Sequence, residues 1–260
     1  MGVAAAVSGR GAHAQAGKDK RVSLTDGRPL SEAHLELVQQ ARSLVTYEDA
    51  YYEYKGDLDF SYVAGPVQLK RDGSPTVIDS LFSRPRWSQR PRTLVFDYST
   101  ADLANPDLLF ANLLSTYHMN FAENEYRLVR EGPWLHILPK AGKNAKGQLI
   151  ERPSRLDVRV TFPDAERTAD ETISLLIKTI NDTTSSNILF GVGAESLLGR
   201  TKVRAGAQNE IARHVLMRVL EATGQQVTWR LLCTFDATPD KRTDIYVNDG
   251  ACGLNFRVLE

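Results

Sequence analysis

The feature that most limits the possible folds of this sequence is residues 212–232, ARHVLMRVLEATGQQVTWRLL. They predict a helix that ends at a glycine and leads directly into a strand. Apolar residues recur at helical spacing as far as Leu220, which predicts one buried face. Gly224 stands where a left-handed residue is needed to end the helix, because glycine has no β-carbon to clash. Asn209 is the predicted N-cap. If this unit occurs twice, the repeat decides the architecture.

The second half of the chain has clear boundaries around this unit. SRLDVRVTF, from Ser154, alternates apolar and polar residues, as a half-buried strand does. Thr168 and Glu171 have the spacing of a capping box. The next helix carries its apolar residues on one face, at Ile173, Leu176, Ile177 and Ile180. NILFGVG, TKVRAG, VTWRLLCTF, TDIYVND and LNFRVL are predicted strands, so the expected order is β-α-β-β-α-β-β.

The first half repeats this order. RVSLT predicts a strand, Pro29 opens a helix, and SLVTYE is the strand after it. RTLVFDYS, a helix that starts at Asn105–Pro106, and the hairpin YRLVRE/WLHILP around Gly132–Pro133 complete the series. The two halves are therefore predicted to be an internal duplication.

The predicted fold class is α+β, with two tandem βαββαβ(β) modules, each a small mixed sheet packed with two helices. We expect the first module at residues 20–140, the second at 155–260, and a linker rich in Gly, Lys and Asn at 141–154. Only the first module contains an insertion, residues 52–92, which is predicted to be an extra hairpin or a long surface loop.

Composition narrows the classes of function. Lys plus Arg and Asp plus Glu number 32 each, so the formal net charge is zero, and we expect no nucleic-acid partner because no basic field attracts one. No apolar run reaches the roughly 18 to 20 residues of a transmembrane helix. Residues 1–19 are rich in Gly and Ala and contain the small-x-small sequence Ala12-His13-Ala14, so they are either a signal-peptide remnant or a disordered tail.

No cofactor and no metal site is expected. No two histidines have metal-binding spacing on one helix among His13, His34, His118, His136 and His214. Gly191-Val192-Gly193 with Gly199 lacks the spacing of a dinucleotide-binding loop, and a strand is expected to follow it. Cys233 and Cys252 permit one disulfide in an exported protein, although two unpaired thiols are the favoured interpretation.

The candidate recognition surface combines the tyrosines of residues 47–54 with the basic and aromatic segment that follows. Tyrosine buries a large area at low entropic cost and keeps a polar tip, which suits it to interfaces. Arginines around a tryptophan suit an anion or a base. The candidate binding residues are Tyr47, Tyr51, Tyr52, Tyr54, Trp87, Arg86 and Arg90. The competing interpretation is a strand with flanking loops, in which some tyrosines pack on the core and the acids of the segment face solvent.

Two segments resemble motifs of the secretin and TonB short N-terminal domain. Arg28-Pro29-Leu30-Ser31-Glu32-Ala33 is similar to the pattern that leads its first helix. Residues 211–224, followed by Val227-Thr228-Trp229, are similar to its second helix and the next strand. Tyr117-His118-Met119-Asn120 departs from the Thr-Gly that ends this helix in the family. The resemblance implies an STN-like fold and a periplasmic or secreted bacterial protein, and it assigns no activity.

These features predict a non-enzymatic interaction module of the cell envelope. It would bind a protein partner through a sheet edge or through the insertion. Two alternatives stay open. One is a glycan or small-ligand binder that uses the Tyr and Trp residues of the insertion, and the other is an enzyme with a site between the modules.

Overall fold

The computed structural model describes residues 20–50, 53–63, 84–121, 124–184, 186–234 and 251–259. The first half contains β1 (Lys20–Asp26), α1 (Pro29–Ala41), β2 (Val45–Glu48), η1 (Lys55–Asp57), β3 (Leu58–Val63), β4 (Arg84–Gln89), β5 (Arg92–Tyr98), η3 (Asp102–Ala104), α2 (Pro106–Asn120), β6 (Glu125–Glu131), β7 (Trp134–Lys143) and β8 (Leu149–Glu151). The second half contains β9 (Arg159–Thr168), α3 (Ala169–Thr184), β10 (Ile188–Phe190), α4 (Glu195–Leu198), β11 (Lys202–Ile211), α5 (Ala212–Glu221), β12 (Val227–Cys233) and β13 (Cys252–Val258). No helix in the described ranges is long and apolar enough to span a membrane.

The two halves use the same pattern of strand pairing. In the first half, β1 pairs antiparallel with β5, β2 pairs parallel with β7, and β6 pairs antiparallel with β7. In the second half, β9 pairs antiparallel with β11, β10 pairs parallel with β13, and β12 pairs antiparallel with β13. The structure confirms the α+β fold class, and each strand of the second half has a counterpart in the first.

The halves differ from the prediction in one respect, because they do not keep separate main sheets. Strands β10, β13, β12, β2, β7 and β6 lie side by side in that order, and β8 pairs with β7. The join is the parallel pair β12–β2, in which Arg230 is opposite Tyr47 and Leu231 is opposite Glu48. Residues 141–154, expected as a linker, contribute the end of β7 and all of β8.

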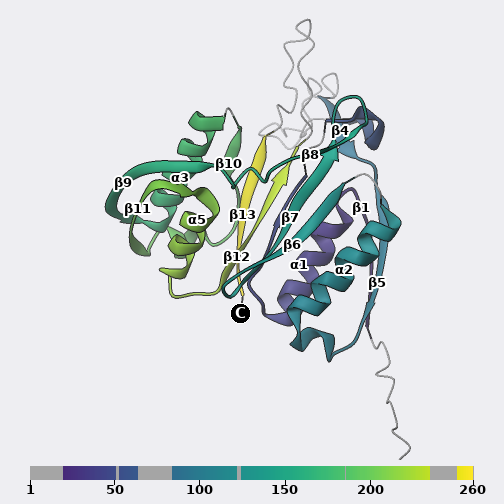
Figure 1. Cartoon of the computed structure of the whole chain (residues 1–260), viewed down its shortest axis with the longest axis horizontal. Coiled ribbons are helices and arrows are strands. Elements are labelled where there is room, and N and C mark those ends of the chain that lie inside the picture. Colours follow the sequence, from purple (N-terminus) through teal and green to yellow (C-terminus); the bar gives the residue numbers. More distant parts are fainter. Residues whose placement is uncertain are drawn as a thin grey trace, which may run out of the picture.

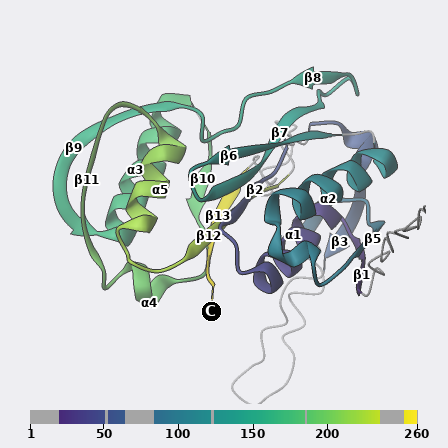
Figure 2. The same cartoon turned by 60° about the horizontal axis from the view of Figure 1, so that its bottom comes forward.

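The helices of the two halves cover opposite faces of this sheet. Figure 1 shows α1 and α2, with β1 and β5 outside them, on one side, and α3 and α5, with β9 and β11 outside them, on the other. Figure 2 shows β9 and β11 curving around α3 and α5. Successive residues on β7 reflect this division, because Trp134 packs in the core of the second half and Leu135 in that of the first. The sheet is therefore buried from both sides near its centre.

Two predicted helix starts are confirmed. The Asn105 side chain accepts the backbone N–H of Leu108 at 3.3 Å at the start of α2. At α3, the Thr168 N–H donates to Glu171 Oε2 at 2.9 Å, and the Glu171 N–H donates to Thr168 Oγ1 at 3.2 Å. These are the reciprocal bonds of a capping box.

The predicted start of α5 is wrong. Asn209 lies inside β11 with φ +54°, and the residue before the helix is Ile211, which caps it with no side-chain bond. The β9–β11 ribbon has a register shift around this position. Asparagine tolerates the left-handed region, so the same property that suits Asn to a cap suits it to this bulge. Gly224 has φ +68°, the left-handed conformation predicted for it.

The strand predicted from Ser154 begins later, at Arg159. Its predicted buried residues Leu156 and Val158 lie in the preceding turn, where their carbonyls accept the first N–H groups of α5, those of Arg213 and Ala212. The turn thus takes the place of a side-chain cap. The short helix α4 lies between Gly193 and Gly199, and the strand expected after this segment follows as β11. The predicted strand TDIYVND and the Gly- and Ala-rich residues 1–19 lie outside the described residues.

The two cysteines form a disulfide, contrary to the favoured interpretation of unpaired thiols. Cys233 at the end of β12 and Cys252 at the start of β13 are direct neighbours across the ladder, and their sulfurs are bonded. Both side chains are buried. Sequence spacing alone could not show this pairing, because it depends on the register of the two strands.

We expect removal of the disulfide by Cys233→Ala with Cys252→Ala to lower the free energy of unfolding. The bridge closes a loop with a sequence separation of 19 residues, for which loop-closure entropy gives about 3 kcal/mol. Urea unfolding of the oxidised protein and the double variant measures the difference. A reducing agent should shift the wild-type midpoint and leave that of the variant unchanged. Equal midpoints for reduced and oxidised wild type would contradict the expectation.

Candidate functional site

The predicted recognition residues do not form one exposed surface in the described structure. Tyr47 is 1% exposed, and its hydroxyl donates to Asp49 Oδ1 at 2.8 Å and lies 3.0 Å from the Tyr126 hydroxyl. Tyr54 is half-buried, with the Lys143 ammonium 5.2 Å from its ring centre. Tyr47 is therefore a core residue, and its prediction as a surface contact is wrong.

The other predicted residues lie in the insertion or, for Tyr51, directly before it. Tyr51 and Tyr52 lie outside the described residues, as do the side chains of Arg86 and Trp87, whose backbone belongs to β4. The described parts of the insertion form the antiparallel pair β3–β4, which is one of the two predicted forms. Arg90 is exposed and follows this pair, with its N–H donating to the Asp57 carbonyl at 3.1 Å.

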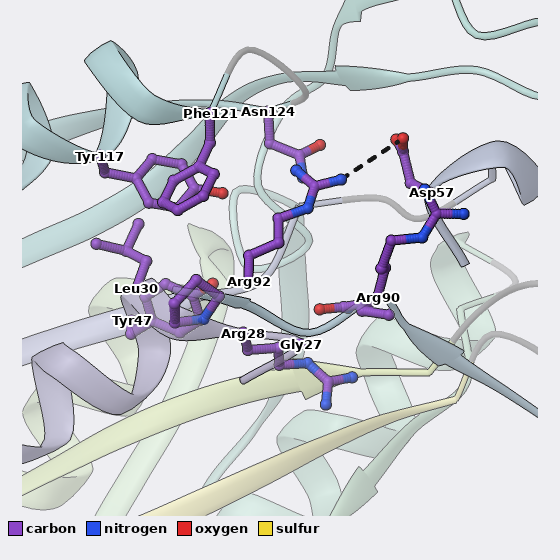
Figure 3. Close-up of a pocket in the computed structure, with 12 residues that line it drawn as sticks. Gly27, Arg28, Leu30, Tyr47, Asp57, Arg90, Arg92, Tyr117, Phe121 and Asn124 are labelled. Atoms are coloured by element: carbon purple, nitrogen blue, oxygen red, sulfur yellow. Dashed lines mark ion pairs between the residues drawn. The ribbon is translucent and has the colours of Figure 1, made fainter. Parts of the chain in front are cut away.

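Arg90 lines a small cavity at the base of the insertion. Figure 3 shows Arg28, Arg90 and Arg92 around it, with an ion pair between Arg92 and Asp57 of 3.8 Å. The Arg92 guanidinium also lies 5.9 Å from the centre of the Phe121 ring. The cavity measures about 30 Å³, which is room for one or two water molecules. These contacts attach the insertion to the rest of the first half, and the cavity is too small for an organic ligand.

The acids Glu48 and Asp49 are buried, although the competing interpretation of the sequence expected the acids of this segment to face solvent. Glu48 is the last residue of β2 and is 0% exposed, and Asp49 is 1% exposed. Adjacent residues of an extended chain point to opposite faces, so the two acids lie on opposite sides of the sheet. Two consecutive acids in an otherwise apolar strand are the signal that could have indicated buried partners.

Asp49 ties β2 to the disulfide end of β12. Its Oδ2 accepts Arg28 Nε at 2.8 Å and the Cys233 backbone N–H at 2.8 Å. Arg28 also donates to the Cys233 carbonyl. A buried carboxylate with several charge-assisted donors is a strong and directional contact. The start of α1 is thus fixed to the second half.

Glu48 ties the opposite face of β2 to α5. Arg213, 3% exposed, donates from Nε to Glu48 Oε1 at 3.1 Å, and its Nη2 forms an ion pair with Asp157 Oδ1 at 2.8 Å. The Ser154 hydroxyl donates to the second Glu48 oxygen. Burial raises the pKa of Glu48, and the positive charge of Arg213 opposes that rise. The cluster is a charged joint between the halves.

A hydroxyl, an imidazole and a carboxylate lie in line beside this joint. Thr46 Oγ1 is 2.7 Å from His136 Nδ1, and His136 Nε2 is 3.6 Å from Glu131 Oε2. Nucleophilic catalysis uses such series, but Thr46 and His136 are both 0% exposed. Neither residue lines any of the three described pockets. No substrate can reach Thr46 in this conformation, so the series is a structural contact.

A more open groove of about 460 Å³ lies over β12 and β13, beside α1. Val38 of α1 and Val192 of the loop after β10 are among the residues that line it. Its two arginines have protein partners, because Arg230 donates to Glu32 at 2.8 Å and Arg257 to Gln39 at 2.8 Å. The size suits a small ligand, and two buried polar atoms of lining residues, His34 Nδ1 and Trp229 Nε1, have no hydrogen-bond partner within the described residues.

The two ends of the main sheet are open edges in the part of the chain that the structure describes. β6 has one strand neighbour, β7, and β10 has one, β13. On β6, the Tyr126 N–H is taken by His118 Nε2 at 3.0 Å. Leu128 is the counterpart of Leu231 in the second half, because Leu128 lies opposite Ile137 and Leu231 lies opposite Leu254. The Leu231 carbonyl points away from β13 and accepts the Asp49 N–H. The Leu128 N–H and carbonyl therefore also point outward, toward a missing neighbour.

The chain matches no protein-family model, and neither a curated protein nor a solved structure shows significant similarity to it. Any function must therefore be inferred from the geometry of the chain itself.

Two buried histidines are expected to make stability fall in acid. Burial lowers the pKa of His34 to about 3 and that of His136 to about 3. Each ring stays neutral in the folded protein but takes up a proton on unfolding below its ordinary pKa. Stability is thus lost as the pH falls from about 6.5 toward 3, by about 2 kcal/mol for each histidine between pH 7.5 and 5.

The measurement compares urea unfolding at pH 7.5 and pH 5.0 for wild type, His34→Gln and His136→Gln. Glutamine is neutral throughout, so each variant should lose its share of the pH dependence. The pKa of Glu48 is raised, which gives a contribution of opposite sign, and the comparison between proteins removes it. An unchanged pH dependence in both variants would show that neither histidine is responsible.

Loss of the Arg213 charge is expected to destabilise the joint. Arg213→Met leaves Glu48 and Asp157 without their main partner, which costs about 3 to 5 kcal/mol. Arg218→Met on the same helix is the matched control, because its ion pair with Glu210 is partly exposed, at 46% and 29%, and such pairs contribute about 1 kcal/mol or less. Equal losses in urea unfolding would mean that burial of Arg213 does not matter.

Proposed function

We propose that the protein is a non-enzymatic interaction protein of the cell envelope that binds a protein partner by adding a strand to β6. The observation that carries the proposal is the outward-pointing backbone of Leu128 on an edge strand of seven residues. A partner strand gains main-chain hydrogen bonds at such an edge, and neighbouring side chains set its specificity.

The side chains of β6 support selective pairing. Arg127 and Arg130 are exposed on this strand, and Glu125 is 42% exposed. Charged residues on an edge strand discourage indiscriminate pairing with other sheets. They also provide the charges that a matched partner strand would complement.

An exported location is supported by the disulfide between Cys233 and Cys252. Disulfides persist in oxidising compartments and are rare in the cytosol. The periplasm or the cell exterior is therefore the proposed compartment, as the resemblance to the short N-terminal domain also implies.

The enzyme alternative loses support from the geometry between the halves. Glu48 and Arg213 are buried there and hydrogen-bonded to each other, and His136 is buried with its Nδ1 2.7 Å from Thr46 Oγ1. The small-ligand alternative keeps one supporting observation, the groove over β12 and β13, which differs in place from the predicted insertion site.

The test uses a proline at an outward position. Leu128→Pro removes an N–H that β7 does not use, and edge strands tolerate such a residue. It should fold normally and bind the partner about tenfold more weakly, since one hydrogen bond of 1 to 1.5 kcal/mol corresponds to that factor. The measurement is quantitative capture from an envelope extract of the source organism.

Val129→Pro is the control for damage to the sheet. Val129 is opposite His136 and its N–H points toward β7, so this variant should lose stability in urea whereas Leu128→Pro should not. If Leu128→Pro captures the same proteins in the same amounts as wild type, strand addition at β6 is wrong.

A further inference from the structure

We propose that the partner strand at β6 is β10 of a second copy of this chain, so that copies associate head to tail through one continuous sheet. This inference rests on the proposed use of the β6 edge and names its occupant.

The repeat itself supplies the geometry. By their pairing, β6 is the counterpart of β12, and β10 is the counterpart of β2. Within the chain, β12 and β2 are already joined in parallel. The strands at the two ends of the sheet, β6 and β10, are thus the counterparts of β12 and β2, which pair with each other at its centre.

The direction of the strands is compatible with this extension. The halves follow each other along the sheet with strand directions reversed and helices on opposite faces. This relation is a half-turn about the axis that crosses the strands, combined with a shift along it. A second such step restores the original orientation, so β10 of a following copy arrives parallel to β6. The contact is heterologous and leaves new open edges at both ends.

Residues at the open edges are more exposed than their counterparts at the join. Leu189 of β10 is 54% exposed, whereas its counterpart Thr46 in β2 is 0% exposed. Leu128 is half-buried, whereas Leu231 is 0% exposed. Val192, just after β10, is 70% exposed. An apolar edge of this kind gains free energy when a neighbouring strand covers it.

The backbone bonds at the start of β10 leave room for pairing. The Asn181 side chain bonds both the N–H and the carbonyl of Ile188, at 2.9 and 2.8 Å. At the join, the counterpart Val45 has its carbonyl bonded by His34, at 2.9 Å, from the preceding helix. The pairing of β2 with β12 starts further along, at Tyr47, which corresponds to Phe190. Further along, the Val192 N–H, the counterpart of the Asp49 N–H at the join, donates to Asn255 Oδ1 at 3.1 Å. Pairing at this edge is therefore centred on Phe190.

One side-chain contact at the join has counterpart residues at the proposed contact between copies. At the join, Arg230 donates to Ser31 Oγ of α1 at 3.1 Å. Arg127 occupies the position of Arg230, opposite Leu138 on the hairpin partner as Arg230 is opposite Asn255. α1 and α3 both end four positions before the next strand starts, which places Ser174 of α3 at the position of Ser31. Ser174 is exposed, so Arg127 of one copy can reach it on the next.

The first test is disulfide trapping in a mixture of two full-length variants, Arg127→Cys and Phe190→Cys, one carrying a size tag. By the register of the join, these positions face each other between copies. Mild oxidation should give a mixed dimer on non-reducing gels, and neither variant alone should dimerise. The control mixture replaces Arg127→Cys with Val95→Cys, which is 42% exposed on β5 and away from both edges, and should give background levels.

The second test is sedimentation velocity over a range of concentrations. Wild type should sediment faster as its concentration rises, and Leu189→Lys, which places a charge on the β10 edge, should lose this shift. Val95→Lys should keep it. A wild type that stays monomeric throughout, together with no mixed dimer above background, overturns the proposal. Dimers of Arg127→Cys alone would overturn it as well, because they would indicate symmetric pairing of β6 with β6.

The two proposals fail separately. Capture of a different protein that Leu128→Pro abolishes, with a monomeric wild type, would retain strand addition and reject the second copy as its occupant. A mixed dimer, with capture from extract unaffected by Leu128→Pro, would support self-association and reject a separate partner at β6.

Discussion

The structure depends on the parallel pairing of β2 with β12 and on the contacts of two arginines with buried carboxylates beside it. β2 has only four residues, all buried, and it lies between strands from both halves. Glu48 at its end and Asp49 directly after it need cations on opposite faces, because successive residues of an extended chain alternate. Arg28 meets Asp49 on one face and Arg213 meets Glu48 on the other. A buried carboxylate without its cation is costly, so these contacts favour the observed arrangement of the two halves.

Much of the fold could be predicted from the sequence because the relevant forces are local. Periodic apolar residues identified the buried faces of α2 and α3, and Asn105 and Thr168 identified their starts, since a cap acts within one turn of its helix. The same reasoning failed at Asn209, where the side chain serves a bulge of β11. Local propensity could not distinguish these uses, because both follow from the tolerance of asparagine for unusual backbone angles.

The candidate site could be predicted less well, because its residues meet over long sequence distances. Glu48 and Arg213 are 165 positions apart, and no local pattern connects them. Tyr47 belongs to a tyrosine-rich segment that resembles an interface by composition, yet the register of β2 directs it into the core. The open edges at β6 and β10 were equally hidden, because an edge is a property of the order of strands in the assembled sheet. The repeat was visible in the sequence, but the use of one sheet by both copies was not.

The distance between Asp49 and Cys233 has a consequence for the order of events during synthesis. Their hydrogen bond joins residues 184 positions apart, and at 5 to 20 residues per second the ribosome needs about 10 to 40 s to produce the partner of β2. Throughout that interval the outer backbone of β2 and the Glu48 carboxylate lack their partners from the second half, whereas Arg28 is already present for Asp49. The nascent chain therefore holds its first module incomplete, and the last strands complete both modules in one late step.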